Sequence, residues 1–281
     1  MAESSLRGQV GEIASRAGVR SVGVSVYDYA HHTGWSLNGD RWFHAASTIK
    51  VPVLLGVFDA IEHGDLAPHA RVHVRNRFLS LVDGRPYRIE SRRDANSAVH
   101  DALGKTLTIR ELALHMIATS SNLATNLLVD VVGIDEIRGT LQRLELHGIE
   151  FVRGVEDDSA WAAGINNRVT PNGLARALRL IAERRAISET ASDHMLEILH
   201  AQEFRRGIPA GLPEDARVAH KTGEMSEAAH DAGIVYLPDR APYVVSILTE
   251  WESETSSRQN AIAAISRAVY EHVARDEEVR V

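Results

Sequence analysis

The chain has 281 residues, with 31 Lys or Arg against 38 Asp or Glu, and its formal net charge is −7. This length allows one large domain or two interleaved lobes with a buried core. An apolar fraction of 44% and a charged fraction of 25% are ordinary for a globular protein and argue against disorder. The acidic balance, without a Lys/Arg block, argues against nucleic acid or an anionic membrane surface as a partner.

The chain contains no cysteine, which excludes disulfides, thiolate zinc sites and a cysteine nucleophile. No stretch approaches the roughly 20 apolar residues that a membrane-spanning helix needs, and the N-terminal residues lack the apolar run of a secretory signal. The protein is therefore expected to be cytoplasmic if Met1 is the native start, or exported if a signal peptide was removed. Histidines such as His69 and His73 lack the sequence context of metal ligands, so we expect no metal site. We also expect no cofactor, and a monomer.

The N-terminal part predicts a sheet followed by a buried helix. After an amphipathic opening, residues 21–27 alternate as a strand does, and residues 35–38 are a plausible hairpin partner. Residues 48–63 are apolar on nearly all sides, which is typical of a buried helix. Gly64 is placed to end that helix.

The middle of the chain, residues 67–207, reads mainly as helices and long loops. Thr108 and Glu111 have the spacing of a capping box. The polar, Arg-rich residues 75–99 are predicted to be an extended loop or insertion. Helices are predicted over residues 107–116, 122–132 and 171–184.

Strand character returns near the C-terminus, before a terminal helix. The strands are predicted over residues 217–222, 232–237 and 243–249. Together with the N-terminal strands they predict an α+β fold: a five-stranded antiparallel sheet built from both termini, flanked by helices, with an inserted all-helical domain. The predicted boundaries are 1–45 and 208–281 for the sheet lobe and 46–207 for the helical lobe.

Lysine occurs only at Lys50, Lys105 and Lys221, and lysine, unlike arginine, can lose its proton near neutral pH when buried. Lys50 follows Ser47 by three residues at the head of the buried helix, on the same helical face. A desolvated, neutral amine there could take the proton of the serine hydroxyl. The alternative is an N-cap serine followed by a surface lysine.

Two further motifs could carry chemistry. In Ser120-Ser121-Asn122, Ser120 could relay a proton and Asn122 could donate to a substrate amide, although a helix cap is the alternative. In Lys221-Thr222-Gly223, the lysine and the hydroxyl could bind a substrate carboxylate, and the glycine permits close approach. Roughly 0.01 chance matches to Lys-Thr-Gly are expected with three lysines. The main-chain N–H groups of Ser47 and Glu224 could form an oxyanion hole.

The three motifs, in this order, resemble those of the penicillin-recognising serine hydrolases and, within them, the class A β-lactamases. Residues 43–53 look like the family's nucleophile segment, and the similarity runs from about Val22 to the terminal helix. The resemblance implies a β-lactamase/DD-peptidase-like fold. It also implies a small-molecule β-lactam or related amide or ester as substrate, opened through a Ser47 acyl-enzyme that water hydrolyses. β-Lactam catabolism and antibiotic resistance are the roles that this implies.

The sequence departs from the family pattern at several points. Ser121 stands where relatives usually carry Asp, and residues 75–99 look longer than usual. The deacylating glutamate normally follows an arginine by two positions, whereas Glu156 follows Arg153 by three, and Ala160 stands where asparagine was expected. Glu156 is the candidate base, with Asp157 behind it. The alternative is an acidic surface loop that pairs with Arg153.

His230 occupies the strand position where many relatives place a carboxylate-binding cation, so it is a candidate anion anchor. The alternative is a histidine on the strand surface.

Two other functions stay open at this point. One is a D-Ala-D-Ala peptidase, esterase or transferase of the same fold, with slow or no β-lactam turnover. The other is a non-catalytic sensor domain that its ligand merely acylates.

Overall fold

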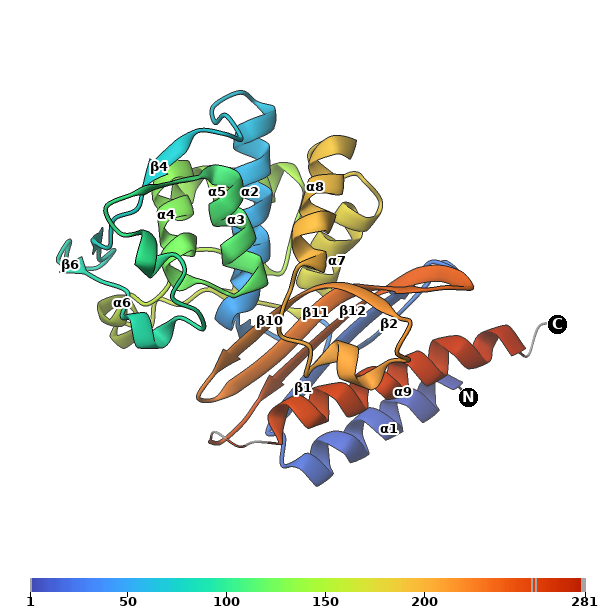
Figure 1. Cartoon of the computed structure of the whole chain (residues 1–281). Coiled ribbons are helices and arrows are strands. Elements are labelled where there is room, and N and C mark those ends of the chain that lie inside the picture. The colour runs from blue at the N-terminus through green and yellow to red at the C-terminus, as the bar shows by residue number, and fades with distance from the viewer. Residues whose placement is uncertain (1, 254, 256, 279–281) are drawn as a thin grey trace. The chain divides into compact units, whose positions relative to one another are not determined.

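The computed structural model describes residues 2–253, 255 and 257–278. The chain folds into two compact units, whose elements are labelled in Figure 1. Unit 1 comprises Met1–Thr48, Val169–Arg179 and Phe204–Val281. Unit 2 comprises Ile49–Arg168 and Leu180–Glu203. The division into domains at residues 45/46 and 207/208 stays a prediction.

Unit 1 is built around a five-stranded sheet in which every neighbouring pair is antiparallel. The strand order is β10-β11-β12-β1-β2, so that β10 lies at one edge. Strands from both ends of the chain meet in this sheet, which confirms the predicted α+β fold class. The strands are β1 (Ser21–Asp28), β2 (Thr33–Leu37), β10 (Arg217–Met225), β11 (Ala228–Leu237) and β12 (Arg240–Glu250).

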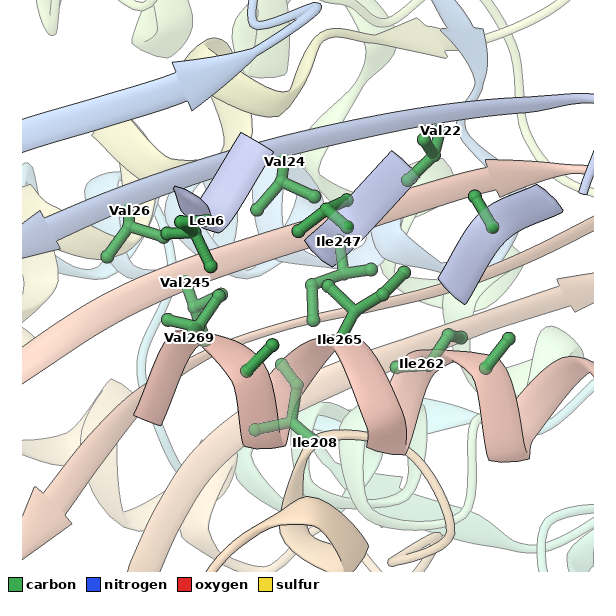
Figure 2. Close-up of a cluster of buried hydrophobic side chains, with 14 of the residues drawn as sticks. Leu6, Val22, Val24, Val26, Ile208, Val245, Ile247, Ile262, Ile265 and Val269 are labelled. Carbon is green, nitrogen blue, oxygen red and sulfur yellow. The ribbon is translucent and has the colours of Figure 1, made fainter. Parts of the chain in front are cut away.

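Helices α1 (Ala2–Ala17) and α9 (Arg258–Glu278) run side by side along one face of this sheet (Figure 1). Figure 2 shows their apolar side chains packed against those of β1 and β12. Leu6, Ile265 and Val269 are buried there against Val24 and Ile247. Burying one such side chain fully contributes about 1.5–3 kcal/mol, so this layer stabilises the sheet of unit 1.

The segment that leads to Ser47 packs closely on β1. A side chain at Gly23 would meet the ring of Phe43 and Pro171 at 2.6–3.0 Å, so only glycine allows this approach. Phe43 lies in β3 (Phe43–His44), which precedes the 3-10 helix η1 (Ala46–Ile49). Unit 1 also holds η4 (Ile208–Gly211) and the start of α7 (Pro171–Ala182).

Unit 2 is mainly helical, with two short strand pairs in addition to the predicted helices. It is centred on α2 (Lys50–Glu62), which is buried at every position from Lys50 to Asp59. The absence of a polar face in the sequence predicts this burial correctly. The observed helix begins at Lys50, because residues 46–49 form the tighter η1 turn instead. The surrounding helices are α3 (Ile109–Ala118), α4 (Asn122–Val132), α5 (Ile134–Arg143) and α8 (Glu189–His200).

The helix starts in unit 2 follow their local sequences. The Thr108 hydroxyl accepts from the N–H of Glu111, and the Glu111 carboxylate accepts from the N–H of Thr108, which confirms the capping box. In the described part of the chain, no helix is long and apolar enough to cross a membrane.

Residues 75–99 are more ordered than an extended loop. They contain a hairpin and a 3-10 turn, because Pro86 and Tyr87 return the chain onto Phe78 and Leu79. The short elements of this region are β4 (Arg71–His73), which pairs with β7 (Thr106–Thr108), β5 (Phe78–Leu79), which pairs with β6 (Pro86–Tyr87), η2 (Ser91–Arg93) and η3 (His100–Ala102). Further along the chain lie β8 (Ile149–Glu150), α6 (Asp158–Ala162) and β9 (Arg168–Val169).

Candidate active site

Ser47 lies in the η1 turn, directly after a strained residue. Ala46 has φ +44°, in the left-handed region that non-glycine residues rarely adopt. The turn is fixed by Thr48, whose N–H and hydroxyl both donate to the carbonyl of Ala45, at 3.1 and 2.5 Å. Backbone strain of this kind costs of order 1–3 kcal/mol and persists where the surroundings hold it. The local structure therefore holds the Ser47 backbone in one conformation.

Lys50 begins α2 with no exposed side-chain surface. Its ammonium nitrogen donates to the carbonyl oxygen of Ser120 at 2.7 Å, to the Ser120 hydroxyl at 3.1 Å and to Oδ1 of Asn122 at 2.7 Å. Burial lowers the pKa of Lys50 from 10.5 to about 7, against the opposing charges of Asp94 and Glu156. The buried lysine predicted by the sequence is thus present, and its burial favours the neutral amine.

Ser120 and Asn122 flank the start of α4. Ser120 has φ +58°, and Ser121 caps the helix by accepting from the N–H of Ala124 at 3.1 Å. The capping interpretation is confirmed for Ser121, and the catalytic and binding roles of Ser120 and Asn122 stay predictions. The Asn122 side-chain amide donates to Oε1 of Glu156 at 3.0 Å, so one amide joins Lys50 to Glu156.

Glu156 lies in a loop that is tied down at both ends. Arg153 donates to the carbonyls of Gly154 and Ile165, and Asn167 bonds the backbone of Arg153. The ion-pair partner of Glu156 is Arg93, whose Nε lies 2.5 Å from Oε2, rather than Arg153. Burial raises the pKa of Glu156, and the Arg93 charge opposes that rise.

Asp157, the second candidate for the base, binds backbone N–H groups of the surrounding segments. Its side chain is buried, and it accepts from the N–H of Ala160 at the start of α6 and from the N–H of Leu81 in the hairpin segment. Glu156, by contrast, accepts a hydrogen bond from Asn122, which also binds Lys50. Lys50, Ser120, Asn122, Glu156 and the residues bound to them are called the Lys50 cluster below. Of the two acids, Glu156 is therefore the one that a hydrogen-bonded side chain, Asn122, links to Lys50.

The edge strand β10 carries Lys221, Thr222 and Gly223, all buried. The ammonium group of Lys221 donates to the carbonyl of Thr222 at 2.8 Å. A side chain at Gly223 would lie 3.1–3.2 Å from the backbone nitrogens of Thr48 and Ser47, so the glycine permits a close approach of β10 to the Ser47 turn. Ser47 and the Lys-Thr-Gly motif are therefore neighbours within unit 1.

Glu224 turns its side chain to the C-terminal helix. Its carboxylate pairs with Arg258 at 2.8 Å. Its backbone belongs to an edge strand, where alternate N–H groups are not needed by a partner strand. The main-chain N–H remains the group that we expect to act in an oxyanion hole.

The expectation for His230 as an anion anchor is not supported by its environment. The ring is fully buried: its Nε2 bonds the carbonyl of His44 at 2.8 Å, and its Nδ1 accepts from the N–H of Thr249 at 3.1 Å. Burial lowers its pKa, which disfavours the cation. His230 therefore ties β11 to the segment before Ser47 as a neutral ring, and it is not on the strand surface either.

Sequence reasoning missed two residues of the Lys50 cluster, Arg93 and Asp94. Arg93 pairs with Glu156, and the Asp94 carboxylate accepts from the first N–H groups of α4. Both belong to the segment that the sequence predicts only as a long insertion, where no local pattern separates them from the surrounding charged residues. Among the residues that the structure describes, no cluster of three or more His, Asp or Glu could hold a metal ion.

The fold gives the class of protein. The antiparallel five-stranded sheet and the mainly helical unit together superpose on solved class A β-lactamases, which belong to the penicillin-recognising serine hydrolases. The chain belongs to the β-lactamase enzyme family, because the sequence profile of that family matches residues 5–273. Its fold is that of the class A β-lactamases, as the similar structures show.

Similar proteins of known sequence are β-lactamases. A β-lactamase of Bacteroides uniformis is 30% identical over 180 residues, a match that covers 59% of this chain and 60% of that protein. The β-lactamase VEB-1 of Pseudomonas aeruginosa is 22% identical over 265 residues, with 89% and 85% coverage.

Similar solved structures cover nearly the whole chain. A β-lactamase from Sphaerobacter thermophilus superposes with a TM-score of 0.80 at 27% identity, over 97% of this chain and 98% of that chain. The structure of PBP-A gives a TM-score of 0.82 at 25% identity, with 96% coverage of both chains.

Proposed function

We propose that this protein is a serine hydrolase that opens β-lactam rings through an acyl-enzyme on Ser47. The observation that carries the proposal is Lys50: a fully buried lysine, with a pKa of about 7, that is bonded to both Ser120 and Asn122. A neutral amine near pH 7 can accept the proton of a nucleophilic hydroxyl. Ser47 stands three residues before it in continuous helical backbone.

In the proposed acylation, the Ser47 oxygen attacks the lactam carbonyl while Lys50, or a water held by Glu156, takes its proton. The main-chain N–H groups of Ser47 and Glu224 stabilise the negative oxygen. One such donor typically contributes about 2.7–4 kcal/mol of barrier lowering. The close approach of β10 at Gly223 supports this pairing of donors.

Breaking the C–N bond then requires a proton for the departing nitrogen. We assign its delivery to the Ser120 hydroxyl, which is bonded to Lys50, together with Lys221. Lys221 and Thr222 are proposed to bind the substrate carboxylate, and Asn122 its side-chain amide. For this, Asn122 must exchange one of the two donated bonds that it makes to Glu156 and to the Arg93 carbonyl.

Deacylation is assigned to a water activated by Glu156. Support comes from its bond to Asn122 and from its burial, which raises its pKa toward that of a useful base. β-Lactam resistance is the role that such an activity would serve.

A second candidate is a penicillin-binding peptidase, esterase or transferase that deacylates slowly. It is favoured by the ion pair between Arg93 and Glu156, because a carboxylate engaged by a guanidinium is a weaker base. The similarity to PBP-A points the same way, and a PBP-A variant has been solved as an acyl-enzyme complex with penicillin G.

One experiment separates the two functions. The protein is mixed with a chromogenic cephalosporin or with penicillin G, and turnover and intact mass are followed together. Sustained turnover supports the β-lactamase, and a lasting mass adduct without turnover supports the second candidate. S47A should give neither, and an adduct on S47A would refute the assignment of the nucleophile.

The deacylating base is tested in the same assay. E156Q should accumulate the adduct, with turnover reduced by about 10²–10⁴-fold. D158N is the matched control, since Asp158 is the exposed neighbour that also contacts Arg93. If E156Q turned over as fast as D158N, the base would lie elsewhere.

A further inference from the structure

The N-terminus of α4 is completed by a residue from far earlier in the chain. The Ser121 side chain satisfies only the N–H of Ala124. The N–H groups of Asn122 and Leu123 instead donate to the carboxylate of Asp94. These are groups that a helix leaves without an internal partner.

Asp94 is held in place as a buried, fully engaged carboxylate. Its side chain has no exposed surface, and it also accepts from the Ser121 hydroxyl at 3.1 Å and lies 3.1 Å from Nε2 of His100. A carboxylate is stabilised at this end of a helix by the dipole and by charge-assisted bonds to backbone N–H groups. Two backbone N–H groups, one hydroxyl and one histidine ring nitrogen therefore surround the Asp94 carboxylate and fix its position.

The capped residues are the ones that hold the reactive lysine. Asn122, whose N–H Asp94 binds, presents Oδ1 to Lys50, and the strained Ser120 turn presents both of its oxygens to the same ammonium group. A turn at φ +58° persists only where its surroundings over-determine it. Loss of the Asp94 anchor would therefore release the turn and misplace the partners of Lys50.

We propose that Asp94, carried by residues 75–99, is a positioning residue that fixes Ser120 and Asn122 around Lys50 through its hydrogen bonds to the start of α4. The inference rests on the proposed function, because it assigns a role in the acylation of Ser47. The insertion is in this sense part of the active site, although Asp94 itself touches neither substrate nor reacting atoms.

The test moves the carboxylate. D94N keeps the shape of the side chain and removes its charge, and it should slow acylation by penicillin G roughly 10- to 100-fold. The double variant D94N/S121D, which places an acid at the N-cap of α4 instead, should recover most of that rate. D101N is the matched control, because Asp101 is an exposed acid of the following turn, and it should acylate at the parent rate.

Rates are measured per active site, by intact mass in a rapid-mixing experiment, so that partly unfolded protein does not count. Recovery of the rate in D94N/S121D is the readout that separates positioning from a purely structural cap, and the pH dependence reports the charge of Asp94. The Asp94 charge opposes the lowering of the Lys50 pKa, so in D94N the acidic limb of the acylation profile should shift to lower pH.

Unchanged acylation in D94N would by itself overturn the inference while leaving the proposed function intact. Recovery of thermal stability without recovery of rate in D94N/S121D would also overturn it, since Asp94 would then be a structural cap alone. If the parent protein itself is never acylated, the proposed function fails, and the positioning role fails with it.

Discussion

Burial of Lys50 should make the stability of this protein depend on pH in a defined window. The folded state lowers the pKa of Lys50 from 10.5 to about 7, so between these values the unfolded chain binds more protons than the folded one. Stability then rises with pH across the window, and the cost of burying the amine is largest below pH 7. One pKa unit corresponds to about 1.4 kcal/mol, so the full shift amounts to roughly 5 kcal/mol.

The substitution K50M isolates this effect, because methionine fills a similar volume without a charge. Integrating the proton difference from pH 7 to pH 9 gives a change of about 2 kcal/mol in the stability of the parent relative to K50M. Denaturant unfolding of both proteins at the two pH values measures this change directly. Other titrating groups are shared by the two proteins and largely cancel.

K105M serves as the control for removing a lysine from the surface, because Lys105 is exposed. If the parent and K50M differed by the same amount at pH 7 and pH 9, Lys50 would remain charged throughout. The amine could then not act as the base for Ser47.

Three further predictions concern the surroundings of Lys50 and Ser47. G223A should lower kcat/KM for a cephalosporin by roughly 10- to 100-fold, because the new methyl group would press on the backbone nitrogens of Ser47 and Thr48. Parent-like kinetics would show that the close approach of β10 to the Ser47 turn is not needed for activity. R93Q should raise the pKa of Glu156, because the Arg93 charge lowers it. The acidic limb of the deacylation profile should therefore move to higher pH, and an unmoved limb would refute the coupling. H230L should lower the free energy of unfolding by about 2–4 kcal/mol in denaturant, because it leaves two buried backbone groups unpaired. KM should not change. A raised KM at parent stability would show that His230 contacts the substrate after all.

Local and periodic features of the chain were open to prediction from its sequence. Alternation and apolar runs predict the sheet and the buried α2, because strand and helix periods are short-range properties. The capping box at Thr108 and Glu111 is likewise a contact between residues three apart. The three motifs predict the family, which the matching profile confirms.

The roles of the candidate site residues stay predictions, and the tertiary structure decides which of them are plausible. His230 was misjudged because its burial depends on His44 and Thr249, which are distant in sequence. Asp157 and Glu156 are adjacent in sequence, yet one caps α6 and the other reaches Asn122.

The sequence by itself determined the fold class and the residue types available for acyl transfer, because these follow from patterns within a few residues. Only the tertiary structure decided how Lys50 is surrounded. Arg93 and Asp94 reach Glu156 and the start of α4 from another segment. Contacts of this kind depend on how the whole chain packs, and no local periodicity encodes them.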